Sequence, residues 1–415
     1  MTNHRHTARD LSEVAKPLRA APWARVALLG LGAFAVGTDA YIVAGLLPDM
    51  ARGLQVTQPA AGQSVTVFAV GYAVLSPALA AMTGRLPRHR LLACGLGVLV
   101  VANLVVAAAG GLEMALAGRA IAAAGAALYT PTAITVSASL VPAAQRGRAL
   151  SVVPGGLTLA TVVGVPLGTL ADQHLGWRVV LVLVSALAAV VLLGVVGAVR
   201  GVPPEPSVGL RVRLRVLRRT VVLAMLAVTV LGVGGSYAVY TYASSVLQQG
   251  VGLPGTQVGL ILAAYGIGAM LGNLASGYGI DRVGPRLVLA AAFGAQVVAL
   301  AALWAVGTFD AGDTIAAGLA AALWGSGTWS QAPAQQYRLI TLAPDAARIV
   351  ISLNGSAIYL GIGVASALGG ITLELLGVRP LPLLSAAVAA GALLMVLVPG
   401  SSLANASRSA ARRST

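Results

Sequence analysis

A long apolar stretch lies near the N-terminus: Val26-Ala-Leu-Leu-Gly-Leu-Gly-Ala-Phe-Ala-Val-Gly-Thr-Asp-Ala-Tyr-Ile-Val-Ala-Gly-Leu-Leu47. A helix needs roughly 20 apolar residues to cross the hydrocarbon core of a bilayer. The stretch is therefore long enough to span a membrane. The whole chain agrees, because 58% of its 415 residues are hydrophobic and only 9% are charged, whereas soluble domains are about a quarter charged. The sequence predicts an all-α membrane protein.

Eleven further apolar stretches follow, each bounded by charged residues or by Pro and Gly. The expected helices are 24–47, 62–82, 91–110, 112–140, 149–171, 177–199, 220–246, 257–278, 287–307, 313–336, 349–373 and 380–399. This pattern predicts twelve transmembrane helices in two six-helix halves, as in many transporters. The expected parts are a tail at 1–23, an N-terminal half at 24–199, a linker at 200–219, a C-terminal half at 220–399 and a tail at 400–415.

The basic residues set the expected orientation of these helices. Placing both termini in the cytoplasm puts only Arg52, Arg178 and Arg379 in outer loops and leaves Arg119 inside a helix. The other 23 of the 27 Lys and Arg residues then lie in cytoplasmic segments. Because the cytoplasmic loops of membrane proteins are enriched in Lys and Arg, the sequence predicts cytoplasmic termini.

The linker is basic, and its pattern has two interpretations. Taken alone, Leu210-Arg-Val-Arg-Leu-Arg-Val-Leu-Arg-Arg219 alternates in a way that indicates a strand or a nucleic-acid-binding segment. Beside a membrane helix, it indicates a cytoplasmic belt against anionic lipid. The net charge of +15 does not favour nucleic acid as a partner, because the basic residues do not gather on one soluble face.

Two charges are expected inside the membrane. Of the twelve acidic residues, one falls in the hydrocarbon: Asp39. At 1.5 Å per residue, Asp39 lies roughly 13 Å from the outer end of its helix, taken as Pro48. Arg119 lies roughly 10 Å from the outer end of the fourth helix, counted from Leu112. The two are at similar depth in the same half, and an unpaired arginine there would be very unfavourable, so Arg119 is the candidate partner of Asp39.

Three interpretations of Asp39 stay open at this point. An ionisable residue within the membrane is by default a functional hypothesis, and Asp39 would then exchange a proton against a substrate. Alternatively, Asp39 and Arg119 form a structural pair that fixes helix packing. In the third interpretation, Thr38 and Asp39 cap a broken helix beside Gly37. A structural role is at least as well supported for Arg119 as a functional one.

The fifth helix carries a candidate gate in Pro154-Gly-Gly-Leu-Thr-Leu-Ala-Thr-Val-Val-Gly-Val-Pro-Leu-Gly168. Gly156, Gly164 and Gly168 share one helix face and permit close helix contact. Pro154 and Pro166 remove backbone hydrogen bonds, which kinks a helix. Ordinary packing of small residues is the alternative explanation. The combination of two prolines with a glycine face favours a bend or gate.

Aromatic and amide side chains in several helices are candidates for a cavity lining. Such a lining suits an amphipathic organic substrate better than a small ion. The candidates are Tyr41, Tyr237, Tyr240, Asn273, Trp329, Gln331 and Asn354. Each also has an ordinary explanation, because Tyr and Trp occur at membrane interfaces and Asn forms interhelical hydrogen bonds.

Neither a cofactor nor a metal is expected. The sequence contains no Gly-x4-Gly-Lys-Ser/Thr motif, so ATP is not expected to drive this chain directly. The single cysteine and the four histidines are scattered: Cys94, His4, His6, His89 and His174. They form no metal-binding set, and no catalytic set of side chains points to an enzyme.

Several motifs carry a family resemblance. The segment Gly37–Asp49 resembles a first-helix signature, and Arg119–Gly125 resembles a fourth-helix arginine motif. The segments 141–150, 164–168 and 175–178 resemble an antiporter motif with its preceding loop, and 352–356 with Gly361, Gly369 and Gly370 resembles an eleventh-helix pattern. Together they make the chain similar, over residues 24–399, to the twelve-helix drug:proton antiporter branch of the major facilitator superfamily. Within that branch it resembles actinobacterial chloramphenicol-resistance and arabinose-efflux-like exporters.

The loop motif of that superfamily, Gly-x3-Asp-Arg-x-Gly-x-Arg, occurs after the eighth helix. Its members are Gly277, Asp281, Arg282, Gly284 and Arg286. In the corresponding place after the second helix, Gly84 stands at the Asp position and Pro87 at the Gly position. The charge contact attributed to this motif is therefore not expected in the N-terminal half.

The resemblance implies alternating access, with a cavity between the halves and export coupled to inward proton flow. It also implies a monomer whose partners are a small-molecule substrate, protons and the lipid bilayer. The resemblance further implies a location in the inner (cytoplasmic) membrane. Asp39 is expected to bind the proton or a substrate cation, with Arg119 as its partner. The alternatives are an exporter of sugars or of an endogenous metabolite, a uniporter, and a sensor that binds a ligand without moving it.

Overall fold

A computed structural model describes residues 22–199, 209–309 and 312–398. The described residues do not include residues 200–208 at the start of the linker. They include only Pro22 and Trp23 of the predicted N-terminal tail and none of the predicted C-terminal tail. The cytoplasmic placement of the termini therefore stays a prediction. Within the described ranges the secondary structure is helical, and no strand occurs there.

The N-terminal half contains the six predicted helical segments. They are α1 (Pro22–Gly53), α2 (Gln58–Met82), α3 (Arg88–Ala107), α4 (Leu112–Ser139), the run α5 (Arg146–Leu159), η2 (Ala160–Gly164) and α6 (Val165–Leu175), and α7 (Trp177–Ala198). A short 3-10 turn, η1 (Ala143–Gln145), precedes α5. Apolar side chains are spread around most of these helices, because each helix faces either its neighbours or the membrane.

The C-terminal half also contains its six predicted segments. They are the run α9 (Thr220–Thr241), α10 (Ala243–Ser245) and η3 (Val246–Gly250), then α11 (Gly255–Val283), α12 (Pro285–Phe309), α13 (Thr314–Leu342), α14 (Ala347–Leu376) and α15 (Leu381–Leu397). The 3-10 turn η4 (Pro344–Ala346) joins α13 to α14.

Ten of the described helical segments are long and apolar enough to cross a membrane. α15 is apolar but has only 17 residues. α13 has 29 residues but is not one of the ten, and it carries the buried polar side chains of Thr328, Gln331 and Gln335. The chain is thus a multi-pass helical protein, and the count of twelve crossings stays a prediction.

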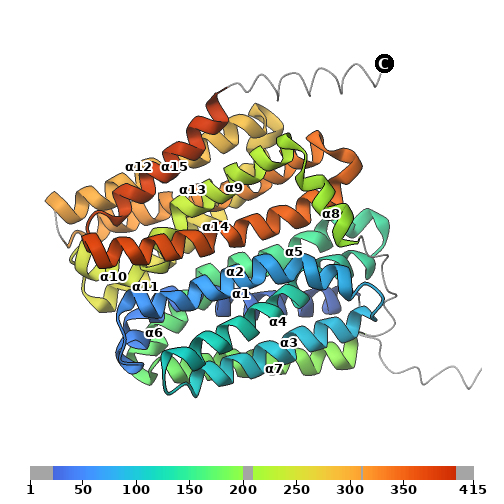
Figure 1. Cartoon of the computed structure of the whole chain (residues 1–415), viewed down its shortest axis with the longest axis horizontal. Coiled ribbons are helices and arrows are strands. Elements are labelled where there is room, and N and C mark those ends of the chain that lie inside the picture. Colours follow the sequence, from blue (N-terminus) through green and yellow to red (C-terminus); the bar gives the residue numbers. More distant parts are fainter. Residues whose placement is uncertain (1–21, 200–208, 310–311, 399–415) are drawn as a thin grey trace, which may run out of the picture.

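The two halves lie side by side (Figure 1). α2 of the first half packs against α14 of the second, and α11 packs against η2 and α6. The halves thus meet along two helix pairs. α1 and α9 also approach each other there. Residues on these two helices and on α2 and α14 line the cavity described below.

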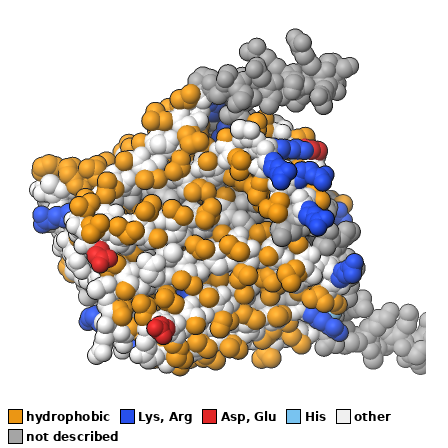
Figure 2. All heavy atoms as spheres, viewed as in Figure 1, with side chains coloured by type: hydrophobic (Ala, Val, Ile, Leu, Met, Phe, Trp, Pro, Cys, Tyr) orange, Lys and Arg blue, Asp and Glu red, His pale blue; other side chains and the backbone are white. Residues whose placement is uncertain are grey.

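The basic linker forms a helix, α8 (Leu210–Leu217), so its interpretation as a strand is wrong. Within α8, Val216 is buried, and the Arg213 guanidinium donates a hydrogen bond to the Ser352 hydroxyl of α14, 2.8 Å away. Leu217 packs against the same buried cluster as Val216, whereas Val212, Leu214 and the other arginines of α8 lie at the surface, because residues that alternate along the chain are spread around a helix. Figure 2 shows basic side chains gathered at the end of the molecule where α8 lies, with hydrophobic side chains along the flank.

α1 differs from its prediction in two respects. It continues past Pro48 to Gly53, so Pro48 is not its outer end. It is also unbroken at Gly37, Thr38 and Asp39, which overturns the interpretation of Thr38 and Asp39 as caps of a broken helix. A continuous helix satisfies its own backbone groups at this depth, so no side-chain cap is required.

Candidate functional site

Asp39 on α1 and Arg119 on α4 form a buried ion pair. The Arg119 Nη1 atom lies 2.8 Å from Asp39 Oδ1, and both side chains are almost completely inaccessible to solvent. Nη1 also approaches the Asp39 carbonyl oxygen, and Nε approaches the Ser64 carbonyl oxygen of α2, each at 3.5 Å. The structure therefore brings together the two charges that the sequence placed at similar depths. Their opposite charges offset much of the cost of burial in a low-dielectric interior.

The pair keeps unused hydrogen-bonding capacity. Within the described part of the chain, Asp39 Oδ2, Arg119 Nη2 and the Ser64 hydroxyl are buried without a hydrogen-bond partner. Buried polar atoms of this kind are normally satisfied by a partner or by an ordered water. One carboxylate oxygen, Oδ2, is therefore without a hydrogen bond while Oδ1 contacts Arg119.

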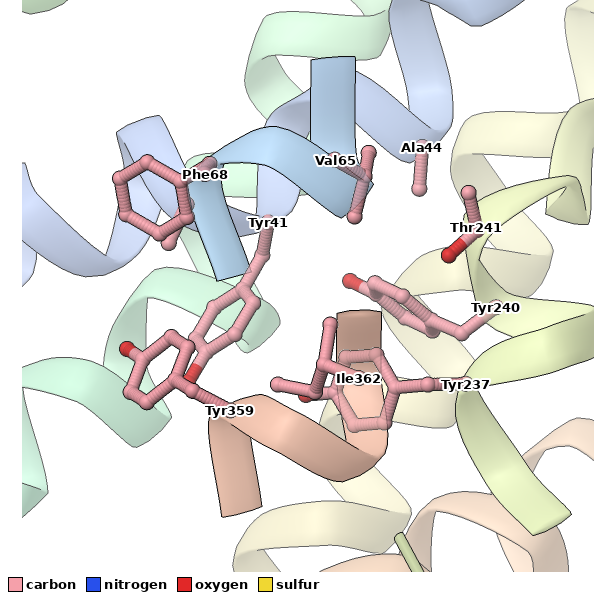
Figure 3. A pocket seen from close by; sticks show the side chains of 10 residues that line it. Tyr41, Ala44, Val65, Phe68, Tyr237, Tyr240, Thr241, Tyr359 and Ile362 are labelled. Atoms are coloured by element: carbon pink, nitrogen blue, oxygen red, sulfur yellow. The ribbon is translucent and has the colours of Figure 1, made fainter. Parts of the chain in front are cut away.

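A small cavity lies between the two halves, next to this pair (Figure 3). It is lined by Ala40, Tyr41, Ala44, Val65, Phe68, Tyr237, Tyr240, Thr241, Tyr359 and Ile362. The volume of the cavity is about 10 Å³, close to the lower limit for holding one water molecule. In this structure the cavity is therefore too small for a molecule much larger than water.

The cavity wall is aromatic and uncharged. Figure 3 shows the rings of Phe68, Tyr41 and Tyr359 on one side of the cavity and those of Tyr237 and Tyr240 on the other. Tyr41 and Tyr237 bring their ring centres to 6.3 Å across the boundary between the halves. Among the described lining residues none is acidic or basic. Such a wall offers stacking surfaces and a few hydroxyl groups to a ligand.

The other predicted lining residues have different surroundings. Trp329 stands edge-on to Tyr41 with ring centres 6.1 Å apart, just behind the lining. Gln331 donates a hydrogen bond to the Thr328 carbonyl of its own helix, and Asn354 accepts one from the Thr229 hydroxyl. Asn273 is half-buried on α11. The structure does not place these three amides among the lining residues, and the bonds of Gln331 and Asn354 lie inside the C-terminal half.

The proposed gate in α5 to α6 contains a distinct backbone feature. Pro154 lies inside α5, whereas the helix widens into the π turn η2 immediately before Pro166. Such single π turns inside α-helices often occur at functional sites. A Cβ added to Gly266 of α11 would lie 2.5 Å from the Thr161 carbonyl oxygen, so η2 is in close contact with the opposite half.

The three glycines that were predicted to share a helix face all face α1. A Cβ on Gly156, Gly164 or Gly168 would overlap the Gly30 carbonyl, the Thr38 hydroxyl or the Ile42 side chain, respectively. The predicted glycine face therefore allows α5 and α6 to pack directly on the helix that carries Asp39.

The loop motif spans the end of α11 and the start of α12, and its last arginine contacts the end of α15. Gly277, Asp281 and Arg282 lie in the last turns of α11, and Gly284 ends the helix with φ of 83°, a conformation that favours glycine. Arg286 is the second residue of α12 and donates hydrogen bonds to the carbonyls of Val396 at 2.9 Å and Leu397 at 2.6 Å. Arg286 thereby satisfies carbonyls at the end of α15 that the helix itself leaves free.

Sequence reasoning missed several residues of this region. Asp172 is a second buried acid. It lies within α6, which continues to Leu175, and it is 6% exposed. Phe68 and Tyr359 line the cavity but were not selected. Phenylalanine is rare in this chain, with only four residues, and this rarity was the property of the sequence that could have drawn attention to Phe68. Nothing in the sequence indicated which face of its helix Phe68 occupies.

Comparison with protein families gives a clear match. The family model described as Major Facilitator Superfamily matches residues 29–365 and, in a second match, 226–414. The chain belongs to the Major Facilitator Superfamily. It is accordingly a multi-pass membrane protein of the transporter type, and the boundary between its two halves is the place where the aromatic cavity was found.

Two curated members of the Major Facilitator Superfamily are similar to this protein at 30% identity. One is the "Uncharacterized MFS-type transporter YbcL" of Bacillus subtilis (strain 168), aligned over 84% of this chain and 89% of the relative. The other is the "Inner membrane transport protein YdhP" of Escherichia coli (strain K12), aligned over 89% of this chain and 94% of the relative.

Solved structures agree on the Major Facilitator fold. A D-xylose-proton symporter superposes with a TM-score of 0.75 at 15% identity, covering 92% of this chain and 98% of the symporter. A mutant form of the nucleoside transporter NupG superposes with a TM-score of 0.73 at 14% identity, covering 91% of this chain and 99% of the transporter. At such low identity these similarities describe the fold alone.

Proposed function

We propose that this protein exports small amphipathic organic compounds, such as chloramphenicol, in exchange for protons entering the cell. The observation that carries the proposal is the buried Asp39–Arg119 pair beside an uncharged aromatic cavity between the halves. An aromatic wall with a few hydroxyl groups binds an amphipathic molecule through stacking and single hydrogen bonds. The resemblance of the sequence motifs to the drug:proton antiporter branch supports the same assignment.

Asp39 is the proposed proton site and Arg119 its partner. Ionisable residues inside a membrane segment pair with one another and often mark proton relays or ion pathways. Protonation of Asp39 removes its negative charge and leaves Arg119 without a counter-ion. The two states of the pair therefore differ electrostatically, and this difference is available to favour one arrangement of the halves over the other.

Alternating access is the proposed way in which the halves move. The contacts across the boundary towards the C-terminal end of α1 include the Ser244 hydroxyl, which donates to the Ala44 carbonyl at 3.1 Å and the Gly45 carbonyl at 3.0 Å. In the predicted orientation this end is the outer one, and its contacts close the cavity from outside. The segment from Pro154 through Gly164 and Pro166 to Gly168 is the proposed gate, because its π turn touches α11.

The remaining parts of the proposal concern the membrane. We place the protein in the inner membrane with both termini in the cytoplasm, in agreement with the basic residues around α8, and expect α8 to contact anionic lipid. We expect it to act as a monomer. The charge distribution supports the orientation, and the name of the Escherichia coli relative supports the location.

A sugar or metabolite exporter is the second candidate, because proteins named as xylose and nucleoside transporters share the fold. The cavity argues against a sugar, since many hydroxyl groups would need polar partners that its wall supplies sparsely. A ligand sensor differs from both in binding without transport, so substrate-dependent proton movement in vesicles would exclude it.

The first test is the accumulation of chloramphenicol in an efflux-deficient host. We expect wild-type protein to lower accumulation, and both an uncoupler and Asp39→Asn to abolish this effect. Equal export by wild type and Asp39→Asn would show that the coupling site lies elsewhere. Failure of the wild type to export chloramphenicol, despite good membrane expression, would remove the drug assignment.

A further inference from the structure

Phe68 on α2 lies between the ion pair and the cavity. Its ring centre is 4.3 Å from the Cζ atom of Arg119. The same side chain is part of the cavity wall and is 2% exposed. One aromatic ring therefore contacts the buried cation and also borders the space in which a substrate would bind.

The contact between Phe68 and Arg119 is a cation–π interaction. The face of an aromatic ring is electron-rich and attracts a guanidinium group, most strongly where water is excluded. The remaining contacts of Arg119 on this side are weak, because its Nε atom is 3.5 Å from the Ser64 carbonyl and Nη2 has no hydrogen-bond partner among the described residues. The position of the Phe68 ring thus helps to determine where the guanidinium lies relative to Asp39.

Phe68 also contacts an aromatic ring of the opposite half. Tyr359 of α14 stands at a steep angle to Phe68, with ring centres 6.1 Å apart. Tyr359 also stacks on Tyr72, one turn further along α2, with ring centres 3.8 Å apart. When the halves separate, Phe68 loses this neighbour. A substrate in the opened cavity would take its place against the same ring.

We propose that Phe68 is a positioning residue that couples occupancy of the cavity to the Asp39–Arg119 pair. The inference rests on the proposed proton-coupled export. Contact with a substrate or with Tyr359 sets the position of the ring, and the ring sets the position of the Arg119 guanidinium. Without the ring, substrate binding and the state of the ion pair become independent, and the protein moves substrate without moving protons in proportion.

The experiment compares two rates in proteoliposomes that contain purified protein, with chloramphenicol as the probe. The first rate is transport driven by an imposed pH gradient. The second is exchange of labelled for unlabelled chloramphenicol without a gradient. Their ratio reports coupling and does not depend on the amount of active protein. For Phe68→Leu, which keeps an apolar side chain but removes the ring, we expect this ratio to fall by about fivefold or more relative to the wild type.

Two further variants separate coupling from packing. Phe68→Tyr keeps the ring over Arg119, and we expect it to retain a ratio close to that of the wild type. Tyr72→Leu removes the neighbouring ring, which touches Tyr359 and not the guanidinium. We expect both rates of Tyr72→Leu to fall together, so that their ratio is preserved.

The outcomes distinguish the two proposals. If the wild type shows no gradient-driven transport of chloramphenicol, the proposed function fails and this inference fails with it. If the wild type is coupled and Phe68→Leu has the same ratio, the inference alone is overturned. A ratio lost equally in Phe68→Leu, Phe68→Tyr and Tyr72→Leu would also overturn it, because general disturbance of the cavity would then explain the effect.

Discussion

The Arg119 guanidinium lies 2.8 Å from the Asp39 carboxylate, and this contact joins α4 to α1 in the interior of the N-terminal half. Both side chains are removed from solvent, so each depends on the other for charge neutralisation. Removing one member of such a buried pair typically costs about 3–5 kcal/mol. The pair is thus a structural element as well as the proposed coupling site, and experiments need to separate these two roles.

Neutralising Asp39 tests the coupling role. We expect Asp39→Asn to reduce proton-driven export by about tenfold or more, because Asn cannot release a proton at this position. Gradient-driven export in vesicles and drug accumulation in cells both measure this effect. Asp49→Asn is the matched control, since Asp49 lies on the same helix but is partly exposed and pairs with Arg52. Normal export by Asp39→Asn would contradict the assignment.

Neutralising Arg119 tests the structural role. Arg119→Gln leaves Asp39 buried without a counter-ion, and we expect a loss of stability of about 3–5 kcal/mol. The double variant Asp39→Asn with Arg119→Gln removes both charges, and we expect it to recover most of the stability without recovering proton coupling. Melting temperatures in detergent give the comparison. If the double variant is as unstable as the single one, burial of an unpaired charge is not the cause.

The glycine face of α5 gives a stability prediction with a neighbour as its control. A Cβ at Gly156 would overlap the Gly30 carbonyl oxygen, which belongs to rigid backbone. We expect Gly156→Ala to destabilise the protein by about 1–3 kcal/mol through overpacking. At Gly155 no atom lies within 4 Å of an added Cβ, so Gly155→Ala should be neutral or slightly stabilising. Thermal unfolding of the two variants checks this difference, and equal behaviour would refute the packing argument.

A close contact between the halves near the start of α2 gives a prediction about conformation. A Cβ at Gly62 of α2 would overlap the Tyr242 hydroxyl from the other half. We therefore expect Gly62→Leu to hold the halves apart at this end and to slow transport. Labelling of a cysteine introduced at Ala44 should become faster in this variant. Gly110→Leu is the control, because no atom lies within 4 Å of its added Cβ; unchanged labelling in Gly62→Leu would contradict the prediction.

The Arg219–Asp345 ion pair next to α8 gives a prediction about pH. Hydrogen bonds from the Arg219 guanidinium at 3.1 and 2.6 Å lower the pKa of the Asp345 carboxyl. A lowered pKa means that the pair stabilises the folded protein above the unfolded pKa of aspartate, and that this contribution disappears as pH falls through the folded value. Because the pair is exposed, Asp345→Asn should cost at most about 1 kcal/mol at neutral pH. Unfolding measurements at falling pH should show wild type and variant converging.

Much of the architecture could be predicted from the sequence because hydrophobicity reports directly on the membrane. The expected segment 112–140 agrees with α4 to within one residue, and 177–199 agrees equally well with α7. The bounds were less accurate where a helix extends beyond its apolar part. α1 continues through Pro48 to Gly53, and α6 continues past Asp172 to Leu175. Only one side of each outer turn is buried, so these turns carry polar residues that end the apolar stretch before the helix ends.

The site was only partly predictable. Asp39 and Arg119 were visible because ionised side chains are rare in hydrocarbon and stand out in an apolar stretch. Tyr41, Tyr237 and Tyr240 were selected and lie at the cavity, whereas Asn273, Gln331 and Asn354 were selected on the same grounds and do not. Phe68 could not be distinguished from other apolar residues, since its role depends on which face of α2 meets Arg119.

The sequence by itself determined that the chain is a helical membrane protein with two similar halves and one conspicuous pair of intramembrane charges. These properties follow from composition and spacing, because the bilayer selects apolar segments of a fixed length. The tertiary structure alone decided that Asp39 contacts Arg119, that glycines of α5 and α6 meet α1, and that Phe68 separates the ion pair from the cavity. Each of these depends on how helices far apart in the chain are rotated and packed against one another, and no local pattern of residues encodes that rotation.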